Sequence, residues 1–249
     1  MNKSDRKVIA ISQSMYFPWI GFFDLMRLSN AFVHYDDVEL TRGLFNRVQV
    51  KTPHGTKMLT VPLKKGGRDR LINQSLISYE SDWVVKHRST LLHSYQKKKC
   101  LEDCISIFDA VHAQNHTTLN HLTKASIITI SKYLGLDENT KFHDSQNLNI
   151  IGSSSDRLLK ITSNLKGSTY LTGHGALNYL DHDLFEQNGI EVNYINYNFK
   201  SYDQVFGAFT PYVTILDAIA HLGTDAKGIL QSTKVNWREA VERPEKLRP

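Results

Sequence analysis

The apolar positions near the start of the chain predict a strand, a helix and a second strand in succession. Residues 7–13 contain the unbroken apolar run VIAI, which is typical of a strand covered on both faces. Pro18 is tolerated in the first turn of a helix, and the apolar side chains after it recur at helical spacing, which predicts a helix over residues 19–28. Residues 31–35 then read as a second buried strand. We therefore expect a βαβ unit with parallel strands.

The middle of the chain changes from strand-like to helical spacing. Residues 48–52 and 57–63 flank a Pro-His-Gly turn, so they are predicted to pair as a hairpin. Three stretches between residues 81 and 134 then repeat apolar side chains at helical spacing, which predicts a helical insert. Residues 169–172 and 190–197 are further predicted strands.

Together these elements predict an α/β fold, with a Rossmann-like parallel sheet flanked by helices, an inserted helical subdomain and a small β-hairpin. We expect three parts along the chain. They are the N-terminal βαβ unit plus hairpin (residues 1–80), the helical insert (81–140) and a C-terminal α/β half that completes the same domain (141–249).

Composition narrows the class of protein. The 249 residues are 41% apolar and 22% charged, which is typical of a globular chain with a substantial core. The net charge of +5 favours acidic partners such as phosphates, while no nucleic-acid-binding motif is present, so we expect no nucleic-acid partner. No apolar stretch reaches the ~18 residues of a membrane span, and the polar start MNKSDRK lacks a signal-peptide pattern. We therefore expect a cytoplasmic protein without a membrane span.

Candidate functional residues follow the first two predicted strands. Ligands of parallel sheets bind beyond the carboxyl ends of the strands. Gln13, Tyr16 and Trp19 follow the first strand, and the acidic pair Asp36 and Asp37 follows the second. The aromatic side chains either stack on a ligand or fill the core, and the polar side chains need partners, of which a ligand is one.

A second group lies just before the predicted hairpin. Asn46 and Arg47 are expected near the two aspartates. The planar guanidinium of Arg47 suits a phosphate or carboxylate of a ligand, and it equally suits a structural ion pair with Asp36 or Asp37.

Further candidates lie in the helices and in one aromatic loop. His87 and Tyr95 share one face of the helix predicted over residues 81–98, where they either complete the core or face a substrate. Gln204 belongs to the aromatic, non-periodic stretch 202–209, which is predicted to be a loop lining a site.

The turn after the strand 169–172 carries Gly173, His174 and Gly175 and is predicted to open a helix at Ala176. Amide groups at such a helix start can bind an anion, although glycines also simply permit a sharp turn. His174 could act as an acid or base at neutral pH.

Two other groups of ionisable side chains need an explanation. Asp217 lies in an otherwise apolar helix and is expected to pair with Arg47 or a tyrosine. His112, His116 and His121 have no carboxylate or cysteine at regular ligand spacing, so they are predicted to be surface histidines and no metal site is expected.

Four motifs in order resemble the WbqC-like family found among O-antigen biosynthesis proteins. They are QSMYFPWIGFFDLMRLSNAFVHYDDVEL, FNRVQVKTPHGTKMLTVPL, STYLTGHGALNYLD and YDQVFGAFTPYVTILDAIAHLG, and the resemblance covers about residues 8–223. It implies a transferase that moves an amino acid or acyl group onto amino sugars of the lipopolysaccharide O-antigen. Two positions depart from the family pattern, because Ser14 stands where proline is usual and His174 stands where histidine is unusual.

The turn Pro18-Trp-Ile-Gly-Phe22 also looks like the His-x-Gly-His turn of HIGH-type nucleotidyltransferases. Trp19 and Phe22 replace both histidines, so adenylyl transfer by those histidines is not expected.

The leading hypothesis is a transferase that acylates or aminoacylates the amino group of a nucleotide-linked deoxyamino sugar. The donor would be an acyl or aminoacyl thioester of coenzyme A or a carrier protein. The alternatives are a non-catalytic sugar-nucleotide-binding protein and a metal-dependent glycosyltransferase that uses the acidic pair. The candidate catalytic residues are Asp37, Asp36 and His34, and the candidate substrate-binding residues are Gln13, Tyr16, Trp19, Asn46, Arg47, His87, Tyr95, Gly173, His174, Gln204 and Asp217.

Overall fold

A six-stranded sheet forms the centre of the described part of the chain, which comprises residues 6–41, 43–67 and 70–243 of this computed structural model. Its strands, in spatial order, are β5 (Lys141–Asp144), β2 (Ala31–His34), β1 (Val8–Ser12), β6 (Thr169–Thr172), β7 (Glu191–Asn196) and β8 (Thr233–Asn236). The first five are parallel and only β8 runs antiparallel to its neighbour. The predicted α/β fold with a mainly parallel sheet is confirmed.

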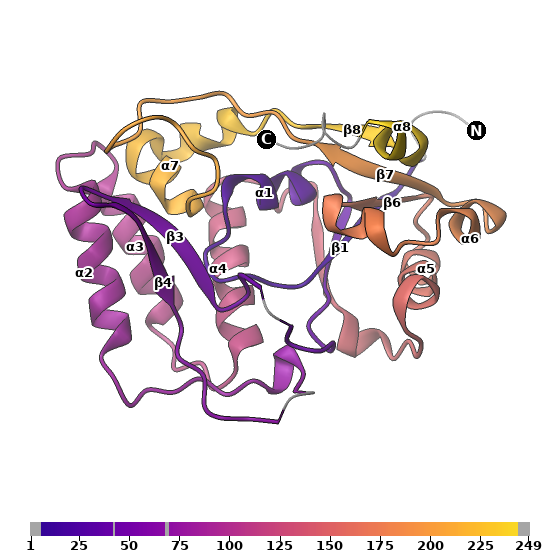
Figure 1. Cartoon of the computed structure of the whole chain (residues 1–249), viewed down its shortest axis with the longest axis horizontal. Helices are drawn as coiled ribbons and strands as arrows, with labels where there is room; N and C mark the ends of the chain where they lie inside the picture. The colour runs from indigo at the N-terminus through magenta and orange to yellow at the C-terminus, as the bar shows by residue number, and fades with distance from the viewer. Residues whose placement is uncertain (1–5, 42, 68–69, 244–249) are drawn as a thin grey trace.

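Helices cover both faces of this sheet (Figure 1). The α-helices are α1 (Ile20–Arg27), α2 (Trp83–Tyr95), α3 (Leu101–His112), α4 (Leu119–Tyr133), α5 (Ser154–Asn164), α6 (His182–Gln187), α7 (Ile215–Leu222) and α8 (Trp237–Glu242). The 3₁₀ helices are η2 (Ile72–Gln74), η3 (Ser145–Leu148), η4 (His174–Asn178) and η5 (Gly223–Ile229).

The apolar run of β1 explains its central place. Val8 and Ala10 pack into the core that contains residues of α1 to α4 and α7, whereas Ile9 and Ile11 pack into a second core with residues of α5, α6 and α8. Successive side chains of a strand point to opposite faces, so an unbroken apolar run is buried on both sides.

The predicted hairpin is also confirmed. β3 (Arg47–Thr52) and β4 (Gly55–Thr60) pair antiparallel, and Gly55 closes the turn with a φ of +99°, a conformation that glycine adopts readily. The hairpin lies beside α2, at the end of the molecule that also holds α3 and α7 (Figure 1).

The strand order places a switch in direction between β1 and β6. From β1 the chain crosses to β2 and then to β5 on one side, and β5 is followed by α5 and β6, which lies on the other side of β1. Connections that leave in opposite directions open a crevice at the carboxyl ends of two adjacent strands, where ligands of open α/β sheets bind. Within the ranges described above, no helix is both long and apolar enough to cross a membrane.

Candidate functional site

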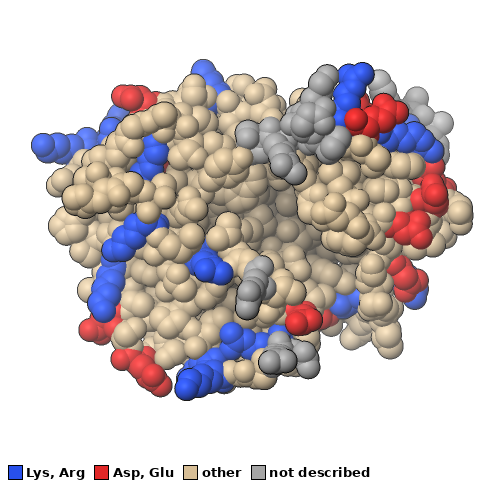
Figure 2. Space-filling view, viewed as in Figure 1, with Lys and Arg blue, Asp and Glu red and all other residues tan. Residues whose placement is uncertain are grey.

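Two adjoining cavities lie at the carboxyl ends of β1 and β6, and the space-filling view of the same face is hollowed near its centre (Figure 2). The aromatic cavity, of about 410 Å³, is lined by Met15, Trp19, Phe22, Leu25, His174, Tyr197 and Tyr212. The polar cavity, of about 380 Å³, is lined by Gln13, Tyr35, Leu158, Tyr170, Ala176 and Tyr179. Ile11, Ser12, Thr172, Gly173 and Gly175 line both cavities, which together form one cleft.

A strained backbone turn places Trp19 in the aromatic cavity. Phe17 has a φ of +41°, which is rare for a residue with a side chain. Its amide donates to Ser126 Oγ at 3.2 Å, and its carbonyl oxygen accepts from Thr214 Oγ1 at 2.8 Å. These buried bonds to two distant helical segments hold the turn between β1 and α1 in a conformation that costs free energy.

Gly21, in α1, leaves room for the ring of Trp19. A Cβ atom at Gly21 would lie 2.3 Å from the indole ring of Trp19 and 2.8 Å from the ring of Tyr197. The Trp19 ring also lies 5.9 Å from that of Tyr212, centroid to centroid. The aromatic wall therefore requires the absence of a side chain at Gly21.

His174 lines the aromatic cavity, between two glycines that line both cavities, and the position of its ring hydrogen is defined. Its Nε2 lies 2.9 Å from the carbonyl oxygen of Ile195. A carbonyl oxygen only accepts, so Nε2 carries the hydrogen, and in the neutral ring Nδ1 is the basic nitrogen. Among the described residues that line the cleft, His174 alone has an imidazole, carboxylate or amine group.

The glycine beside this histidine keeps space at the junction open. Apart from its two chain neighbours, no described residue has a heavy atom within 4 Å of the place where a Cβ atom at Gly175 would lie. Packing does not require glycine at this position. The small size of Gly175 instead keeps open the two cavities that it lines. A ligand can approach the backbone closely at this point.

The polar cavity borders an ion pair. The Arg157 guanidinium lies 4.9 Å above the ring of Tyr35 and forms an ion pair with Asp37, which also accepts a hydrogen bond from the Ser145 hydroxyl. Burial raises the pKa of Tyr35. The predicted catalytic Asp37 is thus engaged by Arg157, beside the polar cavity.

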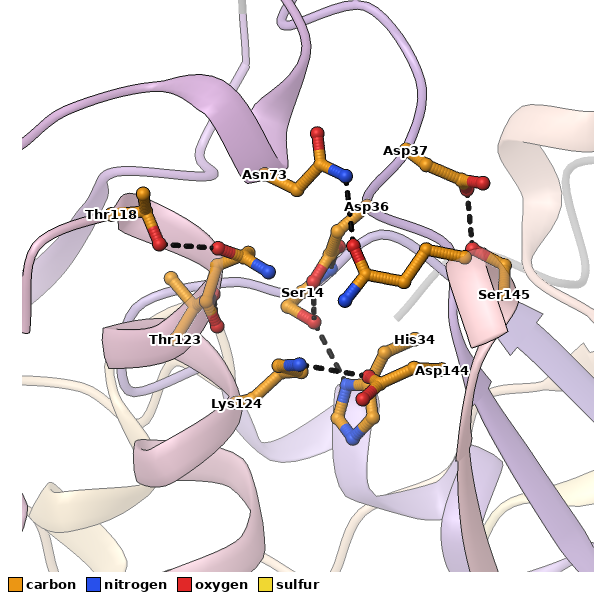
Figure 3. Close-up of polar contacts among 12 residues, drawn as sticks. Ser14, His34, Asp36, Asp37, Asn73, Thr118, Thr123, Lys124, Asp144 and Ser145 are labelled. Carbon is orange, nitrogen blue, oxygen red and sulfur yellow. Dashed lines mark hydrogen bonds and ion pairs between the residues drawn. The ribbon is translucent and has the colours of Figure 1, made fainter. Parts of the chain in front are cut away.

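The other two predicted catalytic residues form a buried network with Ser14 (Figure 3). Asp36 accepts from the amide and the hydroxyl of Ser14, both at 2.7 Å, and the same hydroxyl lies 2.8 Å from His34 Nδ1. Burial raises the pKa of Asp36 to about 6 and lowers that of His34 to about 4. Lys124 pairs with Asp144 next to this network, at 2.9 Å.

Tyr16 and His87 lie together in the core of the helical region. The Tyr16 hydroxyl lies 3.1 Å from His87 Nδ1 and 3.3 Å from His112 Nε2. Since His112 Nδ1 donates to the carbonyl oxygen of Phe108 at 2.9 Å, its Nε2 accepts from Tyr16. All three rings pack around Trp83, which places Tyr16 and His87 away from the two cavities.

Gln204 and Asp217 belong to a third buried network. Gln204 donates to the Tyr202 hydroxyl at 2.9 Å, and that hydroxyl donates to Asp217. The expectation that a tyrosine pairs with Asp217 is confirmed, and burial raises the pKa of this carboxyl. Tyr95, which is fully buried, packs nearby against the ring of His221.

Asn46 and Arg47 bond to backbone near the hairpin. Asn46 donates to the carbonyl oxygen of Val61 at 2.9 Å, and Arg47 donates through Nε to that of Gly43 at 3.0 Å. The ion pair between Arg47 and Asp37 that the sequence allowed is replaced by the pair with Arg157.

The structure therefore brings four predicted site residues together in the cleft, namely Gln13, Trp19, Gly173 and His174. It adds lining residues that the sequence reasoning did not select: Ser12, Tyr35, Thr172, Gly175, Tyr179, Tyr197 and Tyr212. Ser12, Tyr35, Thr172 and Tyr197 lie in the last two positions of predicted strands, which was the available signal.

No set of three or more histidine, cysteine or acidic side chains is placed to hold a metal ion in the described ranges. The predicted surface position is right for His121 and wrong for His116, which is buried and bonds to the carbonyl oxygen of Val111 at 2.7 Å. His112 is half-buried against Phe108. Both rings complete the core of the helical region.

Comparison with known proteins agrees with the motifs. The sequence model of the WbqC-like protein family matches residues 13–229, and this range contains all the described cleft residues except Ile11 and Ser12. The chain belongs to the WbqC-like protein family. This WbqC-like chain is also 30% identical, over 229 residues, to Uncharacterized protein Rv1507c of Mycobacterium tuberculosis, and the match covers 90% of the chain and 98% of that protein. No solved structure matches it.

Proposed function

We propose that this WbqC-like protein is a transferase that acylates the amino group of a nucleotide-linked deoxyamino sugar in the cleft between β1 and β6. The observation that carries the proposal is the cleft itself. It lies at the switch point of a parallel sheet, it has one polar and one aromatic half, and a single imidazole stands among its described lining residues. The proposal includes a cytoplasmic location, which the sequence led us to expect, and a place in O-antigen biosynthesis, which the resemblance to the family implies.

The polar cavity suits the acyl acceptor. Gln13, Thr172 and the phenol of Tyr35 offer donors and acceptors for sugar hydroxyls and phosphate oxygens. Tyr179, with 57% of its surface exposed, offers a ring at the rim for a nucleobase. The net charge of +5 favours the approach of a nucleoside diphosphate.

His174 suits the proton transfer. The sugar amine attacks the thioester carbonyl carbon, so that a carbon–nitrogen bond forms and the carbon–sulfur bond breaks. His174 Nδ1 takes the proton that the nitrogen loses, and the thiolate that leaves is protonated to the free thiol. The products are an amide and a thiol, and the step requires no metal or redox partner.

The contacts of the acidic pair favour this mechanism over a metal-dependent glycosyltransferase. Asp36 is buried and bonded to Ser14, while Asp37 is paired with Arg157 and Ser145. Neither carboxylate lines the cleft. We therefore assign proton transfer to His174 rather than to the acidic pair.

The test is incubation of the purified protein with nucleotide-linked amino sugars and pantetheine thioesters, followed by mass spectrometry of the sugar nucleotide. Pantetheine is the thiol arm shared by coenzyme A and acyl carrier proteins, so one donor set covers both sources. The proposal expects an N-acylated product whose formation depends on His174. Tight sugar-nucleotide binding without product from any donor would favour the non-catalytic binding protein instead.

A further inference from the structure

The positive charge of the chain is concentrated in the segment that contains the β3–β4 hairpin. Residues 40–68 contain seven lysines and arginines and no aspartate or glutamate. The whole chain has 30 basic and 25 acidic side chains, so the remainder of the chain is more acidic than basic. Lys57, Lys64 and Lys65 are exposed, and no described lysine or arginine of this segment forms an ion pair with a described carboxylate. Such a segment attracts an anionic partner.

Exposed apolar side chains lie on one face of the same hairpin. Side chains alternate along a strand, so Arg47 and Met58 point away from the face on which β3 buries its two valines. Met58 is 38% exposed, and Leu44, three residues before β3, is 42% exposed. This face therefore presents both apolar surface and a guanidinium group to solvent.

The loop before α7 adds a third exposed apolar side chain. Lys51 points to the same face of the hairpin as Met58, and its ammonium group donates to the carbonyl oxygens of Gly207 and Ala208. These bonds hold the loop against the hairpin, and the neighbouring Phe206 is 43% exposed. The hairpin surface, as we call it, consists of Leu44, Arg47, Met58 and Phe206.

The hairpin surface is connected to the aromatic cavity through a short stretch of chain. The loop continues to Tyr212, which lines that cavity, and to Thr214, whose amide donates to the carbonyl oxygen of Gln49 in β3 at 2.9 Å. Thr214 also forms an isolated β-bridge with Trp19, a second lining residue of the cavity. A partner on the hairpin surface is therefore close enough for a flexible arm to enter the cleft.

A carrier protein matches these features better than coenzyme A does. Acyl carrier proteins are small acidic helical domains that hold a thioester at the end of a flexible pantetheine arm. Their acidic side chains complement the basic segment, and a protein surface can cover apolar side chains that lie outside the cleft. Coenzyme A carries its phosphates on one nucleotide, whereas Arg47 and Lys57 lie about 10 Å apart along the hairpin and point to opposite faces.

We infer that the hairpin surface binds an acidic acyl carrier protein, whose pantetheine arm enters the cleft beside the loop before α7. This inference rests on the proposed function and names the source of its thioester. The sugar nitrogen bonds to the thioester carbon and the carbon–sulfur bond breaks. The proton that the nitrogen loses ends on the thiol of the carrier's arm.

The decisive comparison uses the same set of acyl groups on three donors, namely pantetheine, coenzyme A and a purified bacterial acyl carrier protein. We expect kcat/KM with the carrier protein to be at least 100-fold higher than with either small donor. Between about 0.05 M and about 0.3 M salt it should fall at least fivefold, because salt screens the attraction. Equal kcat/KM with coenzyme A and the carrier protein would overturn the inference and leave the acyltransferase standing. Product from none of the donors would overturn both.

A charged variant locates the contact. Met58→Glu places a carboxylate in the hairpin surface, outside the two cavities. We expect kcat/KM with the carrier protein to fall at least tenfold and kcat/KM with the pantetheine thioester to stay within twofold. Ile151→Glu is the matched control, because Ile151 is an apolar residue with 89% exposure in the segment before α5, and it should change neither value more than twofold. Equal effects on the two donors in a folded Met58→Glu protein would contradict binding at this surface.

A second variant keeps this test open if Met58→Glu does not fold. Leu44 lies outside the strands, so Leu44→Glu changes the same surface without altering the hairpin pairing. We expect the same selective loss with the carrier protein. Unchanged kcat/KM with the carrier protein in Leu44→Glu would contradict the placement.

A basic and apolar surface also suits an anionic membrane, and sedimentation with phosphatidylglycerol vesicles separates the two partners. We expect the carrier protein to bind in a titration and the vesicles not to retain the protein at about 0.15 M salt. Retention on vesicles that Met58→Glu abolishes, without binding of the carrier protein, would assign the surface to lipid and overturn the inference.

Discussion

His174 donates its Nε2 hydrogen to the carbonyl oxygen of Ile195, at 2.9 Å, and so links the turn after β6 to the neighbouring strand β7. The contact fixes both the tautomer and the plane of the imidazole. The other described residues that line the cleft offer hydroxyl, amide, backbone and apolar groups.

Replacing this histidine tests its role. In His174→Ala we expect kcat to fall about 10²- to 10⁴-fold, because a positioned general base contributes about that much. The KM for the sugar nucleotide should change less than threefold, since the acceptor occupies the polar cavity. Steady-state kinetics with varied acceptor gives both values. A rise in KM with unchanged kcat would make His174 a binding residue only.

A second prediction concerns the open space at Gly175. Gly175→Val places a branched side chain where, apart from the two chain neighbours, no described residue has a heavy atom within 4 Å of the Cβ position, so folding should be little affected. We expect the KM for the acceptor to rise about tenfold or more, because the side chain occupies the junction of the cleft. Gly228→Val is the matched control, since Gly228 is exposed, has equally open space and lies in η5. Equal KM values for the two variants would argue against ligand binding at the junction.

Gly21 should be sensitive for the opposite reason. In Gly21→Ala the new methyl group must displace the rings of Trp19 and Tyr197, and overpacking of this kind costs about 1–3 kcal/mol of unfolding free energy. Urea denaturation measures the loss, and near-ultraviolet circular dichroism reports the moved rings. Gly228→Ala again serves as the control. A Gly21→Ala protein with native stability and spectrum would show that the aromatic wall tolerates a side chain here.

The buried Asp36 should leave a signature in the pH dependence of stability. Its pKa rises from 3.8 in the unfolded chain to about 6 in the folded protein because of burial. Between these values the folded state keeps a proton that the unfolded state has lost, so this group's contribution to stability falls as pH rises, by about 3 kcal/mol in total. The Asp36→Asn variant has no carboxyl group at this position, so this fall in stability with rising pH is absent from it.

The stability of Asp36→Asn relative to wild type should therefore increase between about pH 4 and pH 6. The difference between the two proteins is the quantity to measure, because His34 titrates in the same window with the opposite sign: its lowered pKa makes stability rise with pH. A difference that stays constant from pH 4 to pH 7 would show that Asp36 is not buried as described.

Tyr16 is expected to contribute to the stability of the fold and not to binding of the acceptor. Tyr16→Phe removes the hydroxyl that contacts His87 and His112 and leaves two buried nitrogens without that partner. We expect a loss of about 1–3 kcal/mol in unfolding free energy and little change in the KM for the acceptor. Chemical denaturation and kinetics on the same preparation separate the two effects. A large change in KM with native stability would place Tyr16 in the site after all.

The fold was largely predictable because the apolar runs of β1 and β2 indicate strands that are buried on both faces. The run VIAI is apolar at every position since the strand has a core on each face. The cleft was partly predictable for a related reason. Gln13, Gly173 and His174 directly follow strands, and the carboxyl ends of parallel strands meet at one edge of the sheet.

What the sequence could not supply is the order of the strands. Arg47 is close to Asp37 in sequence, whereas the actual partner, Arg157, is 120 residues away. β5 lies beside β2 in the sheet, and α5 follows β5 in the chain. This order brings Arg157, in α5, to Asp37. Tyr197 and Tyr212 join Trp19 for the same kind of reason, because β7 and the segment before α7 reach the cleft from distant parts of the chain.

The most direct test of the account is a crystal structure of the protein soaked with a nucleotide-linked amino sugar. The account predicts density for the sugar and diphosphate between the carboxyl ends of β1 and β6, against Gln13, Thr172 and Gly175, with the amino group facing His174. Density only in another cavity, such as the one between Lys64, Tyr79 and His116, would contradict it.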